Sequence, residues 1–418
     1  MKKLNLLFII LVVCSCADRK TVDDNTIINF NHLRHLTESV VLNDTPCDII
    51  HIYAEAPNYQ WVDANDEGIA CVDDVARAAV LYLRYYELTH ADSALIRAKK
   101  LLNFVLFMQA DDGEFYNFID ANHQINRTGV TSRKSFKHWA ARGYWALGVG
   151  YRMFKPVDPQ FASTLKTAFL KCKAPIDTLL ENYQDYTEYK GRKYPQWLVM
   201  NSASDATATL LLGLIEYLKL EHDPQITAYA EKLAEGIMEM QVNDESNFNG
   251  AFLSWLDVWH AWGNAQTQAL ASLGQLLDKP NLIAAAQKEA DYYYNYLIAN
   301  GMLNEWSFSD RNNIKQFPQI AYGIRCMNVG LLRLAEATGD DHYAKNAGQC
   351  AAWLFGRNAA RATMYDAHTG RCYDGISDSS TINHNSGAES TIEALMTLVE
   401  LSSNAVARES LKNISSDF

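Results

Sequence analysis

The sequence predicts an all-α protein built as a closed ring of six helical hairpins, an (α/α)6 toroid, with short β segments in the loops at one mouth. The first observation behind this prediction is a repeat. Six times, a polar, aromatic-rich stretch runs into a long apolar helix that carries small residues. A period of about 55–70 residues between such units indicates stacked pairs of helices. The six stretches cover 71–83, 133–150, 201–218, 256–273, 316–334 and 384–401.

The second observation is a contrast in polarity between two kinds of helix. The repeating helices are apolar nearly all round, as in ARGYWALGVG (141–150), whereas the helices between them are amphipathic, as in ITAYAEKLAEGIMEMQ (226–241). A helix without a polar face is buried on all sides. The apolar helices are therefore expected to form an inner ring and the amphipathic helices an outer ring.

The expected hairpins follow one another in chain order. They are 72–88 with 93–109, 135–154 with 158–182, 203–221 with 225–242, 257–277 with 280–299, 318–337 with 341–356, and 386–402 with a terminal partner. That partner is either 404–412 or, by ring closure, a packing helix expected near 26–42. Short connections make the two helices of a pair antiparallel, so all inner helices run the same way and their N-termini share one mouth.

Composition and charge narrow the class of protein. The chain has 418 residues, of which 48% are hydrophobic and 21% are charged, as in a soluble globular protein. Its formal net charge of −12 argues against nucleic acid or an anionic membrane surface as a partner, because both attract basic patches. A polyanionic substrate is disfavoured for the same reason, unless a local basic cleft overrides the total charge.

The N-terminus has the pattern of an export signal. Lys2 and Lys3 precede an apolar run over 4–13 that is too short to span a bilayer. Residues 13–16 (VCSC) resemble a lipobox, in which Cys16 is the lipidated first residue of the mature protein. Cleavage by ordinary signal peptidase and an uncleaved anchor are the alternatives.

Three segments are therefore expected along the chain. They are a lipoprotein signal peptide at 1–16, a tether at 17–25 and the toroid domain at 26–418. The expected location is the outer membrane, the cell surface or the periplasmic face, with membrane contact through the lipid anchor only. The sequence favours no particular oligomeric state.

The remaining cysteines carry no metal-site pattern. Because several lie in apolar helical runs, we expect buried thiols with at most one disulfide. They are scattered, without a CxxC pair, at Cys47, Cys71, Cys172, Cys326, Cys350 and Cys372. The sequence also contains no dinucleotide fingerprint, phosphate-binding loop, GxSxG elbow or HExxH motif, and neither a cofactor nor a metal is expected.

Several local stretches resemble a known superfamily. They are GIACVDDVARAAVLYLRYYE (68–87), FVLFMQADDGEFYNFID (104–120), ARGYWALG (141–148), and TGRCYDGI (369–376) followed by INHNSGAESTIEALMTL (382–398). With the helical period, they resemble the six-hairpin (α/α)6 toroid glycosidase superfamily. They are closest to uncharacterised bacterial toroid domains, some of which are fused to glycosyltransferases. The resemblance covers about residues 50–402 and implies carbohydrate chemistry in the mouth of the toroid.

Acidic residues at the starts of inner helices are the catalytic candidates, because glycoside hydrolysis needs two carboxyl groups that flank the scissile bond. Asp73 and Asp74 open the first inner helix, where mutual repulsion raises one pKa and the helix N-terminus favours the charged form of the other. Glu389 opens the sixth inner helix, which neighbours the first when the ring closes. Asp257 is a third candidate.

The acids at the two helix starts also have ordinary structural interpretations. Asp73 stands where a helix N-cap would stand. Ser386 and Glu389 have the Ser-x-x-Glu spacing of a capping box.

Further polar and aromatic residues near the junctions are candidates for sugar binding. Asp257, His260 and Asn264 are expected on one helix face, flanked by Trp259 and Trp262. The other candidates are Trp61, His138, Asp205, Trp306 and Asn385. Core packing is the alternative for the tryptophans and for His260. Arg142 is expected to be the buried partner of a carboxylate.

The sequence thus predicts an exported lipoprotein glycoside hydrolase that acts on an oligo- or polysaccharide by carboxylate acid/base catalysis. One alternative is a polysaccharide lyase on the same fold, for which His138, His260, Tyr322 and Arg325 are the candidates. Another is a carbohydrate-binding lipoprotein without catalysis.

Overall fold

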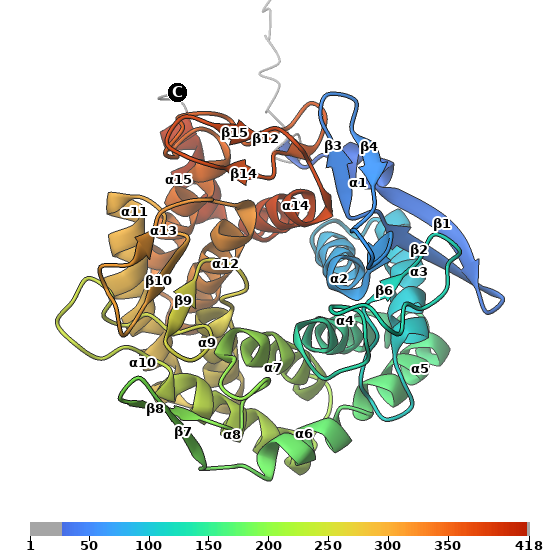
Figure 1. The fold of residues 1–418 in the computed structure, drawn as a ribbon, viewed down its shortest axis with the longest axis horizontal. Helices are drawn as coiled ribbons and strands as arrows, with labels where there is room; N and C mark the ends of the chain where they lie inside the picture. The colour runs from blue at the N-terminus through green and yellow to red at the C-terminus, as the bar shows by residue number, and fades with distance from the viewer. Residues whose placement is uncertain (1–26, 416–418) are drawn as a thin grey trace, which may run out of the picture.

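The computed structural model describes residues 27–415, which form a ring of paired helices (Figure 1). Six helices surround the axis, and the expected inner ring is confirmed. They are α2 (Val72–Thr89), α4 (His138–Phe154), α7 (Ser204–Leu218), α9 (Gln266–Leu277), α12 (Ala321–Thr338) and α14 (Ala388–Ser402).

The outer ring contains the amphipathic helices, several of which begin with local start signals. Pro159, Pro224 and Pro280 open three of them, where a missing amide is tolerated. Asp158 and Asp223 cap two helices by accepting bonds from backbone amides. The outer helices are α3 (Asp92–Met108), α5 (Pro159–Leu170), α6 (Lys173–Leu180), α8 (Pro224–Glu239), α10 (Pro280–Lys288), α11 (Asn295–Asn300), α13 (Asp341–Ala351) and α15 (Ala405–Ser415). A π-helical turn, η2 (Glu289–Tyr294), joins α10 to α11, and a 3-10 turn, η3 (Ala352–Leu354), follows α13.

Short antiparallel strands occupy the loops, as expected. The two-stranded pairs are β1 (Thr37–Leu42) with β2 (Thr45–Ile50), β3 (Tyr53–Glu55) with β4 (Gln60–Val62), β5 (Ala70–Cys71) with β6 (Phe118–Ile119), β7 (Tyr186–Tyr189) with β8 (Arg192–Pro195), β12 (Tyr365–Asp366) with β13 (Arg371–Cys372), and β14 (Gly375–Ile376) with β15 (Ile382–Asn383). A three-stranded sheet orders β11 (Ile314–Lys315), β10 (Glu305–Ser307) and β9 (Val258–His260).

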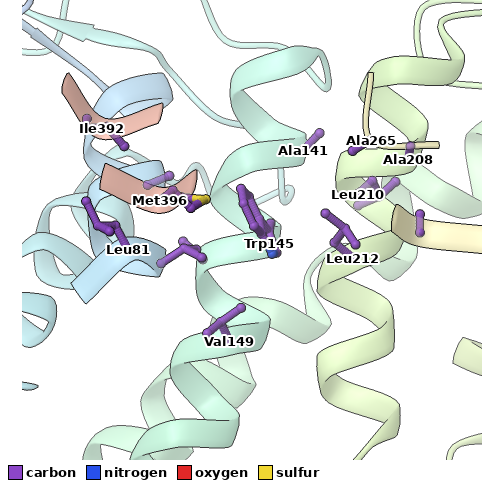
Figure 2. Close-up of a cluster of buried hydrophobic side chains, with 14 of the residues drawn as sticks. Leu81, Ala141, Trp145, Val149, Ala208, Leu210, Leu212, Ala265, Ile392 and Met396 are labelled. Carbon is purple, nitrogen blue, oxygen red and sulfur yellow. The ribbon is translucent and has the colours of Figure 1, made fainter. Parts of the chain in front are cut away.

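Small residues let the inner helices approach closely. A Cβ added to Gly148 of α4 would lie 2.4 Å from the carbonyl oxygen of Gly213 in α7, so the two backbones are in contact there. The ring interior is filled by side chains from several inner helices. In the view of Figure 2, Trp145 projects from α4 among side chains that include Leu81 and Leu212. The toroid is therefore a packed core that leaves room for a site only at its ends.

Three expectations about the elements are wrong. In place of the helix expected near 26–42, residues 27–42 contain only a short helix, α1 (Asn31–His35), followed by β1, because Asn43 and Asp44 adopt positive φ values in a two-residue hairpin turn. Of the two partners expected for α14, the segment near 404–412 forms a helix, α15, that contacts α14. The expected helix 158–182 is divided into α5 and α6.

The third wrong expectation concerns the fourth hairpin. The expected helix 257–277 starts only at Gln266, since residues 258–260 pair with β10 as β9. Gly263, at φ +78°, lies between that strand and α9.

The expected signal peptide, Cys16 and the tether at 17–25 lie outside the described residues. Among residues 27–415, no helix is long and apolar enough to cross a membrane. All six cysteines of this part are buried and free, which confirms the expectation of buried thiols.

Candidate active site

A cavity of about 330 Å³ lies at the mouth, where the starts of α2, α12 and α14 meet. Its volume is near the lower end of the range for small-molecule sites, about 300–1,000 Å³. The first and sixth repeats are thus neighbours, as expected. The cavity is lined by Ile52, Tyr53, Cys71, Asp73, Asp74, Arg77, Arg142, Ile320, Ala321, Tyr322, Asp374, Gly387, Glu389 and Ser390.

Arg77 joins the acids of the two repeats. Its side chain is only 2% exposed, and it donates to Asp74 at 2.6 Å and to Glu389 at 3.1 Å. It also bonds Glu393, one turn deeper in α14, at 2.8 Å. Glu393 accepts a second bond from Arg325 of α12 at 2.5 Å. One buried guanidinium therefore faces three carboxyl groups.

The Arg77 contacts also limit the separation of Asp74 and Glu389. Their oxygens bond the two terminal nitrogens of this one planar guanidinium. The two oxygens are therefore at most about 8 Å apart. Glycosidases hold their two carboxyl groups about 5–9.5 Å apart, and the limit for Asp74 and Glu389 is compatible with that range.

Asp73 is held in its charged form by a different arginine. Arg142 of α4 bonds the Asp73 carboxylate and donates to the Tyr322 hydroxyl at 2.8 Å. Burial works to raise the pKa of Asp73, but the guanidinium groups of Arg142 and Arg77 outweigh it and hold that pKa below its usual value. The expectation that Arg142 is the partner of a carboxylate is confirmed.

The pKa of Asp74 is shifted in the opposite direction to that of Asp73. Burial raises its pKa, the charge of Arg77 opposes that rise, and the charge of Asp73 adds to it. The Cys71 thiol donates to its second oxygen at 3.2 Å. Asp74 also lines the cavity, but its side chain is only 5% exposed and is less accessible than that of Asp73, at 21%.

Glu389 is the most accessible acid of the group, with 47% of its side-chain surface exposed at the cavity. Burial among the cavity walls raises its pKa, Arg77 opposes the rise, and Asp74 and Glu393 add to it. The capping-box interpretation is wrong, because Gly387 is the N-cap and Ser386 donates its hydroxyl to the Cys372 carbonyl. Glu389 is therefore able to face the cavity.

Asp374 is a cavity acid that sequence reasoning missed. It accepts bonds from the Gly387 amide at 2.8 Å and from the Ser390 hydroxyl at 2.6 Å, which fixes the start of α14. Burial raises its pKa. Its place in the TGRCYDGI stretch was a signal, but only the fold brings that stretch beside α14.

A second polar cluster lies next to the cavity. His138 and His260 approach the same oxygen of Asp205, at 3.3 and 3.5 Å. Burial works to raise the pKa of Asp205, but the two imidazoles outweigh it. A Cβ added to Gly263 would lie 3.6 Å from this oxygen and 3.6 Å from the Tyr322 hydroxyl, so Tyr322 connects the two sites.

Two of the expected site residues serve as scaffold near β9. Asp257 is 2% exposed and accepts bonds from Lys190, Ser307 and Ser309, away from the residues that line the cavity. Asn264 is buried and bonds Ser254 and the His260 carbonyl. Because β9 is a strand, Asp257, His260 and Asn264 do not share a helix face.

The expected tryptophans divide between core and surface. Trp259 and Trp306 are 3% and 1% exposed and pair across β9 and β10, so they pack in the core. Trp61 is 42% exposed and stacks on His51, but it does not line the cavity. Tyr53 on β3 and Tyr322 are the aromatic residues that line the cavity.

Asn385 positions the loop before α14, since its side chain accepts a bond from the Ala56 amide at 3.0 Å. Within residues 27–415, no group of three His, Cys, Asp or Glu side chains is arranged to hold a metal ion.

Solved structures share this architecture. A sugar epimerase from a ruminal bacterium has a TM-score of 0.59 at 14% identity, over 91% of this chain and 98% of that one. Cellobiose 2-epimerase from Bacillus thermoamylovorans has a TM-score of 0.61 at 11% identity, over 90% and 97%. An inactive variant of an α-1,6-mannanase of Salegentibacter sp., in complex with α-1,6-mannotetrose, has a TM-score of 0.57 at 12% identity, over 90% and 98%.

No family model and no curated protein matches the chain. At 11–14% identity, the structural likeness shows the fold alone. The chain has the six-hairpin (α/α)6 toroid fold that its sequence motifs indicate, and its structural neighbours include proteins that act on sugars.

Proposed function

We propose that the chain is a glycoside hydrolase in which Asp73 and Glu389 form the carboxyl pair. One observation carries the proposal: two accessible carboxyl groups line one cavity, and their surroundings move their pKa values in opposite directions. The pKa of Asp73 is lowered and that of Glu389 is raised. Such a pair can present one carboxylate and one carboxylic acid at the same pH.

The roles follow from these protonation states. Glu389 donates its proton to the glycosidic oxygen as the bond to the anomeric carbon breaks, and the leaving sugar departs as an alcohol. Asp73 either attacks the anomeric carbon or takes a proton from the water that attacks it. Arg142 keeps Asp73 ionised, and Arg77 holds Glu389 in the cavity.

A feature of one structural neighbour supports the choice of residues. The α-1,6-mannanase is described as inactive when two consecutive aspartates are replaced. This chain also has consecutive aspartates, Asp73 and Asp74, at its cavity. The neighbour binds an oligosaccharide, which supports an oligo- or polysaccharide as the substrate class.

The test is a screen of the purified chain against α- and β-linked glycans, including α-1,6-mannan, with products identified by mass spectrometry. Loss of a positioned acid or base typically lowers the rate by about 10²–10⁴-fold. The cleavage rates of D73N and E389Q should therefore each be lower than that of the wild type by this factor. The matched control is E336Q, at the opposite end of the ring. If both site variants cleave as fast as the wild type, the proposal is wrong.

A sugar epimerase or isomerase is the second candidate, and the His138–Asp205–His260 cluster favours it. Two imidazoles beside one carboxylate could remove a proton from a carbon next to a carbonyl and return it. The structural neighbours include sugar epimerases. Such a reaction in D₂O would place deuterium in the sugar without cleaving it, and an absence of exchange would eliminate this candidate.

A lyase and a carbohydrate-binding protein without catalysis would each give a distinct result in the same screen. A lyase would release an unsaturated product that absorbs in the ultraviolet, although Arg325, one of its candidate residues, is already bonded to Glu393. A binding protein would cleave no glycan, and D73N and E389Q would keep their affinity.

We also propose that the chain is an exported lipoprotein with Cys16 as the lipidated residue. The support is the sequence pattern of Lys2, Lys3, the apolar run over 4–13 and the lipobox-like VCSC. Mass spectrometry of the membrane fraction should find the acyl chains on Cys16. Recovery of an unmodified, soluble mature chain would contradict this.

A further inference from the structure

A second cavity, of about 440 Å³, lies on the rim of the ring between α11 and the loop that follows α13. The segment 316–322 connects it to the candidate active site. Gln316 and Gln319 line the rim cavity, whereas Tyr322 lines the central one. One segment of the chain therefore contributes residues to both cavities.

The rim cavity is basic, although the protein is acidic overall. Arg357 and Arg361 line it, and no carboxylate does. Both arginines are exposed, and neither side chain has a hydrogen-bond or ion-pair partner within residues 27–415. Arg77 and Arg142, by contrast, are paired with acids. Two unpaired guanidinium groups on one cavity are suited to a carboxylate or another oxyanion.

The loop that carries these arginines is braced. The Asn358 side chain donates to the carbonyls of Trp353 and Ala362, both at 2.7 Å, and accepts from the Ala362 amide. Arg361 adopts a left-handed backbone conformation, at φ +50°, within this turn. The backbone of the two arginines is therefore positioned before any ligand binds, which reduces the entropy lost on binding.

The same cavity offers groups that could bind hydroxyls. The side-chain amides of Gln316 and Gln349 line it and make no hydrogen bond within residues 27–415. Each amide has both a donor and an acceptor. A ligand that combines an oxyanion with neighbouring hydroxyls would satisfy the arginines and the amides together.

We propose that the rim cavity binds the carboxylate of an acidic saccharide, with Arg357 and Arg361 on the carboxylate and the two glutamines on hydroxyls. This binding does not depend on the hydrolase reaction. The rim cavity would then be a local basic cleft in a chain whose net charge of −12 otherwise disfavours acidic ligands.

The test measures binding by calorimetry, with trimers of galacturonate, glucuronate and mannuronate as probes. Their methyl esters are the neutral controls, and inorganic phosphate tests a free anion. The protein is the D73N variant, in which cleavage of the probe should be slowed by about 10²–10⁴-fold. At least one trimer should bind, and its methyl ester should bind at least about tenfold more weakly. The R357Q/R361Q substitutions should lower the affinity for the trimer by about the same factor.

The matched control variant is R133Q/K193Q, which removes the same charge from exposed residues that have no side-chain partner within 27–415. This control should bind the trimer with the same affinity as the D73N protein from which it is made. Thermal unfolding of each variant checks that it is folded.

Two outcomes would overturn the proposal: no trimer binds, whether or not phosphate does, or the ester binds as tightly as the acid. An affinity of R357Q/R361Q for the trimer equal to that of the D73N parent would also overturn the proposal. Because the readout is binding, these outcomes are separate from a failure of the proposed hydrolysis.

Discussion

The two ends of the inner ring both carry clusters of arginines and acids, but their charges balance only at one end. At the mouth, three guanidinium groups meet five carboxyl groups. The cations are Arg77, Arg142 and Arg325, and the acids are Asp73, Asp74, Asp374, Glu389 and Glu393. At the opposite end, four cations meet four carboxylates. They are Arg84, Arg152, Lys219 and Arg333 with Glu87, Glu216, Glu336 and Glu400.

This difference appears in the pKa values. At the balanced end, burial works to raise the pKa of Glu216, but Arg84, Lys219 and Arg152 outweigh it and the pKa is lowered. At the mouth, burial raises the pKa values of Asp74 and Glu389, and Arg77, which is shared among several acids, only partly opposes the rise. Balanced ion pairs stabilise a fold, whereas an excess of acid maintains protonatable groups for chemistry.

The largest expected effect is on stability, from removal of Arg77. R77M leaves three carboxyl groups without their shared partner, so the free energy of unfolding should fall by about 3–5 kcal/mol. The matched variant is R84M, seven residues later on the same helix. Its main acid, Glu216, keeps Arg152 and Lys219, so the loss should be roughly half as large. Urea unfolding measures both, and equal losses would contradict the contrast between the ends.

The next effect concerns Glu216. E216Q removes an acid that serves three cations and should lower the free energy of unfolding by about 2–3 kcal/mol at neutral pH. Because the folded pKa is lowered, its ionisation contributes stability above the unfolded pKa of about 4.3 and loses it as pH falls through the folded value. The deficit of E216Q should therefore shrink below about pH 4. A deficit independent of pH would argue against this origin.

Glu389 should behave in the opposite way. Its pKa is raised in the fold, so its ionised form destabilises the protein above the unfolded pKa. E389Q should therefore leave the free energy of unfolding within about 1 kcal/mol of the wild type or slightly above it. Thermal unfolding at neutral pH measures the change, and a loss as large as that of E216Q would make Glu389 a structural residue.

The smallest expected effect is at Glu87. Burial works to raise its pKa, but Arg84 and Arg152 lower it to about 2. Its side chain is 43% exposed, however, and solvent screens the pair. E87Q should therefore change the free energy of unfolding by less than about 1 kcal/mol. Salt should reduce this difference further, and a large, salt-independent loss would contradict the screening of Glu87 by solvent.

The ring and the meeting of its first and sixth repeats could be predicted from sequence, because repeat spacing and helix polarity depend on local pattern. That prediction placed Asp73, Asp74 and Glu389 together. It could not supply the roles of Arg77 and Asp374, since their importance depends on contacts between distant segments. It also could not locate the arginines of the rim cavity, which lie in an irregular loop.

The errors came from segments where two patterns overlap. In residues 257–264, steps of three and four fit a helix, but Val258, Trp259 and His260 also alternate as a strand does. Pairing with β10 buries Trp259 against Trp306 and favours the strand. Near 26–42, the hairpin turn at Asn43 and Asp44 favours strands over the expected helix.

The most direct test of the Asp73–Glu389 assignment compares two substrates in the E389Q variant: an aryl glycoside with a dinitrophenyl leaving group and the natural glycan. A dinitrophenolate departs without a proton, so E389Q should retain most activity on it while losing about 10²–10⁴-fold on the glycan. D73N should lose activity on both. Equal losses on the two substrates in E389Q would contradict the role of Glu389 as the acid.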